Sequence, residues 1–177
     1  MLAVKNVKFF QLRLKKVKKV KILKIAQEIK KITKKYKVKF IINDDPYISK
    51  ITNADGCHLG QGDGSIINSK KYLNKKIIGV TCHNSIKLAK KAILNGANYI
   101  ALGAFFKTKT KKVIFKTDIN TLINIKKSVN LPVVAIGGIT EKNYKKLLLN
   151  KADFLAISGY IWNNKKLKPH QAIKNLT

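Results

Sequence analysis

Short runs of apolar residues recur along the chain, and lysine-rich segments separate them. The runs are rich in Val, Ile, Phe and Ala and carry few charges, which is typical of strands buried on both faces of a parallel sheet. The pattern predicts seven such strands, at residues 7–13, 38–44, 56–60, 77–82, 99–106, 133–138 and 154–160.

Segments between the strands have the period of amphipathic helices, for example residues 22–36, 85–96, 118–129 and 140–150. Residues typical of helix boundaries support them. Asn84 and Ser85 precede one helix and Gly96 follows it, Asp118 opens another, and Thr140 is expected to cap a third. Strands that alternate with helices indicate a parallel α/β fold, either an open doubly wound sheet or a TIM (β/α)8-type barrel.

Polar residues and glycines favour the barrel, because they gather where almost every predicted strand ends. Active sites of such barrels lie at that face and draw on many strands, whereas an open sheet concentrates its chemistry near one switch point. The residues in question are Gln11, Arg13, Asn43, Asp44, His58, Gln61, Asp63, Thr81, Thr108, Thr110, Gly137, Gly138 and Ser158.

The net charge of +30 comes from 38 basic residues against eight acidic ones. A charge of this size suggests nucleic acid as a partner. However, the lysines are spread from end to end and aromatic residues are not interleaved with them, so we expect solvated helix faces and no specific nucleic-acid site. The positive field should still concentrate anionic substrates.

The sequence predicts a cytoplasmic protein that does not bind a membrane. No apolar stretch reaches the roughly 20 residues of a membrane helix, and the N-terminus lacks a signal-peptide pattern. Cys57 and Cys82 form no CxxC pair, so both are expected to be reduced thiols at strand ends.

Seven short motifs occur in one order: QLRLK, IND, HLGQGD, GVTCH, TKTK, AIGGI and AIS. Together they resemble the thiamine phosphate synthase family from about Leu2 to Trp162. The resemblance implies a transferase that joins hydroxymethylpyrimidine diphosphate to hydroxyethylthiazole phosphate and releases pyrophosphate. The implied reaction is a Mg²⁺-assisted dissociative substitution, which needs charge stabilisation and orientation more than acid–base catalysis.

The resemblance also implies that the first strand and most of the first helix of the barrel are missing, since eight strands are needed and seven are predicted. The length nevertheless suits one domain over residues 1–177. A start further upstream, a partner chain over the open edges and a decaying gene are all possible explanations, and a homo-oligomer is one candidate arrangement.

Arg13 is the only arginine of the chain. Gln11, Arg13 and Lys15 alternate with Leu12 and Leu14, so a strand would direct the three polar side chains to one face. The guanidinium of Arg13 can bind phosphate in a bidentate way that lysine cannot reproduce. Arg13 could otherwise be a chance survivor at a strand edge. By resemblance all five residues bind substrate, and Arg13 and Lys15, together with Lys111, are catalytic.

By resemblance Asp44 and Asp63 bind Mg²⁺, which suits its preference for carboxylate and phosphate oxygens. Capping of a turn or helix is the alternative for Asp63, as it is for Asp45 before Pro46. Asn43 is implied to contact the pyrimidine. Asn43 and Asp44 would point to opposite sides of a strand unless the strand ends there.

The remaining implied substrate contacts come from the later motifs. Thr81 is matched to the pyrimidine substrate. The TKTK segment and the two glycines of AIGGI are matched to phosphate groups, together with the backbone after the last strand; an ordinary solvated loop and a tight turn are the alternatives. The residues are Thr108, Lys109, Thr110, Lys111, Gly137, Gly138, Ile157 and Ser158. Lys107 stands where the family usually has proline, which predicts a looser loop.

Two other functions remain open. One is a thiazole tautomerase-like isomerase, in which His83 would be the acid–base catalyst and no carboxylate pair would be needed. The other is an inactive basic relative that binds polyanions through charge alone.

Overall fold

The structure is a computed structural model and describes residues 6–108, 110 and 113–176. It divides into two compact units, one ending at Val80 and the other running from Thr81, so the boundary falls within strand β4. The described residues form seven strands whose order follows the chain, β1 to β7. The sequence pattern therefore predicted the number of strands correctly.

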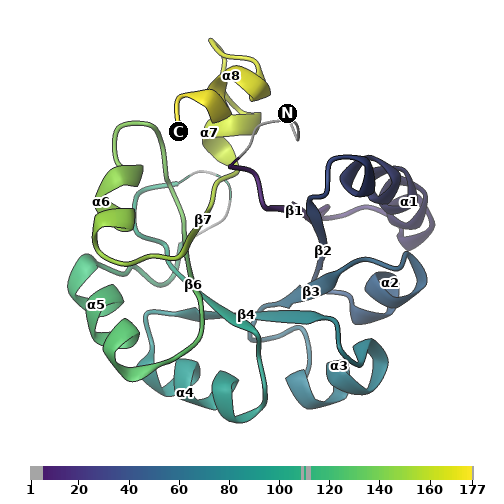
Figure 1. Ribbon diagram of the computed structural model, residues 1–177, viewed down its shortest axis with the longest axis horizontal. Helices are drawn as coiled ribbons and strands as arrows, with labels where there is room; N and C mark the ends of the chain where they lie inside the picture. The colour runs from purple at the N-terminus through teal and green to yellow at the C-terminus, as the bar shows by residue number, and fades with distance from the viewer. Residues whose placement is uncertain (1–5, 109, 111–112, 177) are drawn as a thin grey trace. The chain divides into compact units, whose positions relative to one another are not determined.

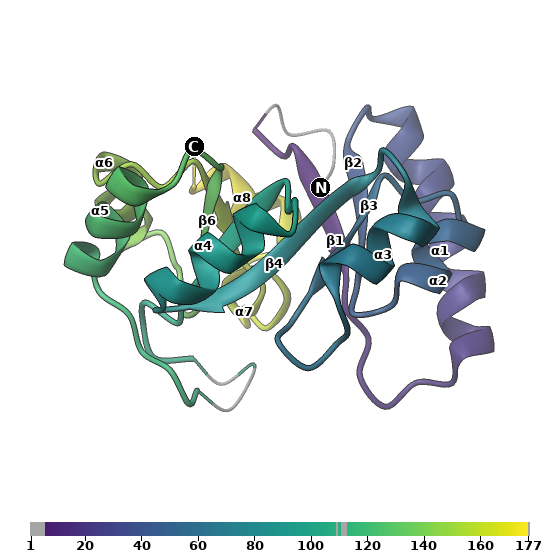
Figure 2. The same cartoon turned by 90° about the horizontal axis from the view of Figure 1, so that it is seen from below.

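The first unit alternates strands and helices from β1 to the start of β4 (Figure 1). Its strands pair in parallel, β1 with β2, β2 with β3 and β3 with β4. Helix α2 packs beside α3 (Figure 2). The elements are β1 (Phe9–Leu12), α1 (Lys19–Lys35), β2 (Lys39–Asn43), α2 (Pro46–Ile51), β3 (Gly56–Leu59), α3 (Ile66–Leu73) and β4 (Ile77–His83).

One core of the first unit lies where α1 packs on β1 and β2. Ala26 of α1 and Phe40 of β2 are fully buried, and Ile48 of α2 is nearly so. Small Ala26 lets the helix approach the large ring of Phe40, so side chains of complementary size fill the interior. This packing fixes the strands whose carboxyl ends carry the polar residues considered below.

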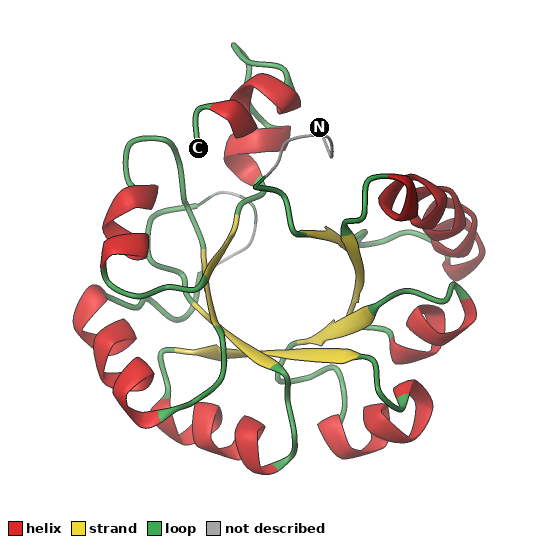
Figure 3. Ribbon diagram, viewed as in Figure 1, coloured by secondary structure: helices red, strands yellow, loops and turns green. Residues whose placement is uncertain are grey.

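The second unit repeats the pattern, with β5 paired in parallel to β6 and β6 to β7 (Figure 3). Helices α7 and α8 pack together after the last strand. The elements are α4 (Ile86–Leu94), β5 (Tyr99–Leu102), α5 (Ile119–Ser128), β6 (Val133–Ile136), α6 (Tyr144–Leu149), β7 (Phe154–Ala156), α7 (Gly159–Trp162) and α8 (Pro169–Lys174).

Several strands end earlier than the apolar runs predict. Strand β2 stops at Asn43, and Asp44 has a left-handed φ of 67°. Strand β6 stops at Ile136 because Gly137 and Gly138 have φ values of 95° and 68°, which take the backbone out of the ladder. The predicted strand to residue 160 was wrong at its end, where Gly159 begins α7.

Helix boundaries were predicted with mixed success. The side chains of Ser85 and Asp118 cap α4 and α5 as expected, and Gly96 follows α4 with a φ of 81°. The prediction that Thr140 caps a helix was wrong, since α6 begins at Tyr144 with Asn143 at its N-cap. Thr140 instead takes part in the preceding turn, where its backbone N–H donates to Asn143 Oδ1 at 2.8 Å.

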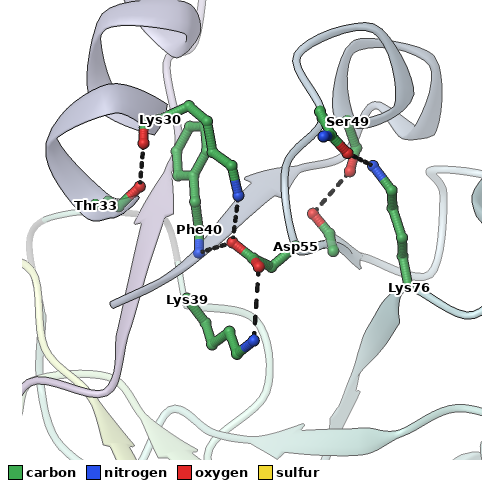
Figure 4. A network of polar contacts seen from close by, with 9 residues as sticks. Lys30, Thr33, Lys39, Phe40, Ser49, Asp55 and Lys76 are labelled. Atoms are coloured by element: carbon green, nitrogen blue, oxygen red, sulfur yellow. Dashed lines mark hydrogen bonds and ion pairs between the residues drawn. The ribbon is translucent and has the colours of Figure 1, made fainter. Parts of the chain in front are cut away.

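The amino ends of β2 and β3 are joined through Asp55 (Figure 4). Its Oδ2 accepts hydrogen bonds from the Phe40 N–H at 2.9 Å and Lys30 Nζ at 2.7 Å, and Lys39 Nζ lies 3.7 Å from Oδ1. Burial opposes ionisation of Asp55, but these donors outweigh it and hold the pKa of the carboxyl below its ordinary value. The carboxylate therefore ties helix α1 to the strand that follows it.

None of the helices in the described part of the chain is long and apolar enough to cross a membrane. Both cysteines are buried and neither forms a disulfide with a described residue, and burial raises the pKa of each thiol to about 12. The prediction of two reduced thiols is confirmed, and neither is ionised near neutral pH.

Candidate active site

Polar side chains of the first unit extend from the carboxyl ends of its strands. The alternation predicted for QLRLK is present, although β1 ends at Leu12: Leu12 is buried and Leu14 packs against the core, while Gln11, Arg13 and Lys15 are exposed. Leu12 and Leu14 therefore anchor the segment, and the polar side chains are left available for a ligand. Arg13 makes no ion pair with any described carboxylate, although its charge helps to lower the pKa of Asp44.

The side chains of Asn43 and Asp44 both face the polar side chains of the segment from Gln11 to Lys15, because strand β2 ends between the two residues. Asn43 is the last residue of β2, and its Oδ1 accepts a hydrogen bond from Gln11 Nε2 at 3.0 Å. The left-handed backbone of Asp44 turns its side chain toward Lys15, with which it forms an ion pair. Because strand β2 ends at Asn43, the side chains of Asn43 and Asp44 can both serve one site.

Asp44 and Asp63 lie within hydrogen-bonding reach of one another. Burial and the neighbouring Asp44 raise the pKa of Asp63 above its ordinary value, against the opposing effect of the Gly60 N–H. Burial also opposes ionisation of Asp44, but the hydrogen bonds from Lys15 and Asp63, together with the charges of Lys15 and Arg13, outweigh it and lower the pKa of Asp44. The pair thus holds one stabilised carboxylate and one whose negative charge is poorly compensated.

A turn directs the carboxylate of Asp63 toward Asp44. The Gly60 N–H donates to Asp63 Oδ2 at 2.8 Å, and a Cβ atom at Gly60 would lie 2.6 Å from that oxygen. Any other residue at position 60 would push the carboxylate away. Asp45, by contrast, accepts a hydrogen bond from the Ile48 N–H at 2.9 Å and caps α2. This is the capping role that its position before Pro46 suggested.

The donor set of this pair fits a hard divalent cation. Two neighbouring carboxylates offer only oxygen ligands, and a cation between them would relieve the repulsion that raises the pKa of Asp63. No group of three or more His, Cys, Asp or Glu residues that could hold a metal occurs in residues 6–108, 110 and 113–176.

In the second unit, Thr110 lies beside Gly159, and Lys107, the residue before Thr108, lies beside Gly138. The Thr110 N–H donates to Thr108 Oγ1 at 3.2 Å. A Cβ atom at Gly159 would lie 3.0 Å from Thr110 Oγ1, and one at Gly138 would lie 2.5 Å from the Lys107 carbonyl oxygen. Thr110 thus adjoins the residue that follows Ile157 and Ser158, and Lys107 adjoins AIGGI. Lys109 and Lys111 lie outside the described residues.

The two glycines of AIGGI also have a packing role that the sequence did not reveal. A Cβ atom at Gly137 would lie 2.4 Å from Ala104 Cβ. The Phe105 and Phe106 N–H groups donate to the carbonyls of Ile136 and Gly137 at 3.1 and 3.0 Å. Glycine is therefore required for the backbone after β5 to lie directly on the turn after β6.

Thr81 and His83 both belong to the end of β4. His83 has a left-handed φ of 55°, and its ring lies 4.3 Å from the ring of Phe115, measured between centroids. The His83 carbonyl accepts a hydrogen bond from the Gly103 N–H at 3.0 Å. The His83 ring thus packs against an aromatic side chain at the end of β4.

Comparison with known proteins agrees with these motifs. Residues 1–161 match the family model described as thiamine monophosphate synthase. The chain belongs to the thiamine monophosphate synthase family. It is 62% identical over 176 residues to the thiamine-phosphate synthase of Pelagibacter ubique, covering 99% of this chain and 85% of that protein. The thiamine-phosphate synthase of Clostridium acetobutylicum is 41% identical over 164 residues, covering 92% and 77%.

Solved structures confirm the fold class of this family member. The thiamine phosphate pyrophosphorylase of Pyrococcus furiosus superposes with a TM-score of 0.86 at 28% identity, over 96% of this chain and 80% of that chain. A 3-hexulose-6-phosphate synthase superposes with a TM-score of 0.72 at 16% identity, over 96% and 85%, which is a likeness of fold. The predicted parallel α/β, TIM-type architecture is thereby confirmed.

Proposed function

We propose that this chain joins hydroxymethylpyrimidine diphosphate to hydroxyethylthiazole phosphate, forming thiamine phosphate and pyrophosphate. Membership of the family and the identity to two proteins named thiamine-phosphate synthase support this assignment. The observation that carries it is the cluster of Asp44, Asp63 and Lys15, with Arg13 nearby, at the strand ends of the first unit. A chain with eight acidic residues places two of them against each other beside cations.

Breaking the bond between the methylene carbon of the hydroxymethylpyrimidine and the diphosphate oxygen leaves negative charge on the departing pyrophosphate. In the proposed mechanism Arg13 binds that group with two parallel N–H donors, and Lys15 leaves Asp44 to meet it. Asp44 and Asp63 would hold Mg²⁺. When bound, Mg²⁺ supplies positive charge to the phosphate oxygens and neutralises both carboxylates.

Orientation of the pyrimidine is assigned to Gln11 and Asn43, whose amides already bond to each other at 3.0 Å, and to Thr81. The segment from Gln11 to Lys15 lies against this substrate. Fixed amides can hold the ring in one orientation while the carbocation forms, and the thiazole nitrogen then captures it.

Phosphate of the thiazole partner is assigned to the second unit. The Thr110 hydroxyl lies beside Gly159, and the Lys107 carbonyl just before Thr108 lies beside Gly138. At both places glycine lets a phosphate approach the backbone. Ile157 and Ser158 would contribute backbone groups. By resemblance, Lys109 and Lys111 are also assigned to substrate binding.

We further propose that the partners of the chain are these small molecules, with no specific nucleic acid or membrane, and that the chain acts in the cytoplasm. Light scattering tests whether the chain forms a homo-oligomer. The even spread of lysine along the sequence supports a solvated surface.

A single assay tests the function. Purified protein is incubated with both precursors and Mg²⁺, with and without a chelator, and thiamine phosphate is read as fluorescent thiochrome. Circular dichroism and light scattering on the same sample report folding and oligomeric state. Chelator-sensitive product is expected. A folded sample without product, but with isomerisation of a thiazole precursor, would overturn the synthase in favour of the tautomerase.

A further inference from the structure

The backbone between β5 and α5 carries Thr108 and Thr110 and is held at two stems within the second unit. The incoming stem, Ala104 to Lys107, lies on Gly137 and Gly138 through the Phe105 and Phe106 N–H groups. The outgoing stem, Val113 to Thr117, is held by Ala104 and by the residues that end and follow β4.

Ala104 joins the two stems. Its N–H donates to the Phe115 carbonyl at 3.0 Å, and its own carbonyl accepts from the Thr117 N–H at 3.0 Å. These two bonds leave the carbonyl of Lys116, between them, directed away from Ala104 and able to accept from another donor.

Asn84 supplies that donor from the end of β4. Its Nδ2 donates to the Lys116 carbonyl at 2.9 Å, across 32 residues of sequence. The residue before it adds a second contact, since the His83 ring lies against the Phe115 ring. The adjacent residues His83 and Asn84 therefore hold the outgoing stem by one aromatic contact and one hydrogen bond.

We infer that Asn84 is a positioning residue for the phosphate-binding hydroxyls of Thr108 and Thr110, and that it sets affinity for the thiazole phosphate. This inference rests on the proposed function through the assignment of those two threonines. The hydrogen bond fixes the outgoing stem, which begins three residues after Thr110. Asn84 itself need not touch either substrate.

The test compares Asn84→Ala and Asn84→Asp with Asn150→Ala. Asn150 provides a matched control, because its Nδ2 donates to the Lys146 carbonyl at 2.8 Å at an exposed helix end. Asn84→Asp keeps the size of the side chain and removes its donor. His83→Asn removes the ring while keeping a residue type that tolerates the left-handed backbone.

Two readouts are needed. Hydrogen exchange should show faster exchange of the Ala104 and Thr117 amides in both Asn84 variants, with the Phe105 and Phe106 amides unchanged. Calorimetric titration and steady-state kinetics should show the Kd and KM for hydroxyethylthiazole phosphate raised by about 3- to 10-fold, as for a lost hydrogen bond. The kcat and the KM for the pyrimidine diphosphate should stay within about 2-fold, and His83→Asn should change in the same direction.

Each result has one meaning. Unchanged exchange at Ala104 and Thr117, or faster exchange with an unchanged Kd for the thiazole phosphate, overturns the positioning role. A wild-type protein that binds the thiazole phosphate but forms no product overturns the proposed synthase, while the ratio of Kd values still decides the role of Asn84. A wild-type protein that does not bind it overturns both.

Discussion

Asp55 and Asp63 flank the same strand, β3, at its amino and carboxyl ends. Asp55 is surrounded by donors: a backbone N–H and two lysine side chains, one of them partly buried (Figure 4). Asp63 receives one backbone N–H and faces a second carboxylate. The opposite directions of their pKa shifts follow from these surroundings.

This difference separates a structural acid from one available to a ligand. The charge of Asp55 is fully used by the fold, since its donors join α1, β2 and the start of β3. Asp153 repeats the arrangement in the second unit, accepting from the Val133 N–H and from Lys126 Nζ, both at 2.7 Å. The charge of Asp63 is left partly unmatched, a condition that functional sites maintain and folds otherwise avoid.

The largest effect is expected for Asp63→Asn. The substitution keeps the shape of the side chain and removes the charge proposed to bind Mg²⁺, so turnover should fall by about 100- to 1000-fold, comparable to loss of one preorganised electrostatic group. Thiochrome assays across a Mg²⁺ titration measure it. A rate within 3-fold of wild type with the same Mg²⁺ dependence would remove Asp63 from the site.

Arg13→Lys should lower turnover by about 10- to 100-fold, because a charged hydrogen bond worth roughly 1.5–3 kcal/mol is lost while the positive charge stays. The melting temperature should not change, since Arg13 is exposed and pairs with no described carboxylate. Lys18→Arg, at an exposed position before α1, serves as the reverse control. Near-normal turnover in Arg13→Lys would refute the bidentate role.

Asp55→Asn should lower the stability of the protein and leave the turnover per folded molecule normal, which is the reverse of the result expected for Arg13→Lys. Leaving Lys30 without its carboxylate should cost about 1–3 kcal/mol, which lowers the melting temperature by about 2–4 °C per kcal/mol in a chain of this size. Glu28→Gln is the control, because Glu28 is exposed and, among the described residues, forms an ion pair only with Lys31, three residues away. A loss of turnover without a loss of stability would contradict the structural role of Asp55.

The smallest effect is a difference in pH dependence between the two acids. The folded pKa of Asp55 is lowered, so its stabilisation is present above the unfolded pKa of about 3.9 and is lost as the pH falls through the folded value. The folded pKa of Asp63 is raised, so its ionisation opposes folding at neutral pH and this cost disappears in acid. Asp63→Asn should therefore melt slightly higher than wild type at pH 7 and equally near pH 3.

Melting curves from pH 3 to pH 8 measure both signs at once. The deficit of Asp55→Asn should shrink toward pH 3, while the small gain of Asp63→Asn should shrink in parallel. If both substitutions lower the melting temperature at pH 7, Asp63 contributes to the fold like Asp55 and the contrast between the two ends of β3 is lost.

Much of the candidate site could be predicted from the sequence, because its residues follow apolar runs closely. Gln11 and Asn43 come at the ends of buried strands, and the structure joins them by a hydrogen bond. The sequence could not show that Asp55 and Asp153 are structural acids. Each lies just before a strand, and only the pairing of that strand with its neighbour brings the acceptor to a backbone N–H about 15 or 20 residues away.

The sequence by itself determined the seven strands and their parallel order, since burial on both faces requires continuous apolar runs. It also determined which polar residues lie at the strand ends, because those residues directly follow the apolar runs. Only the tertiary structure decided the backbone of Asp44, the packing role of Gly137 and the bond from Asn84 to Lys116. Periodicity records whether a residue is buried, which is a local property. Which donor meets which acceptor depends on where the folded backbone brings residues that are distant in the chain.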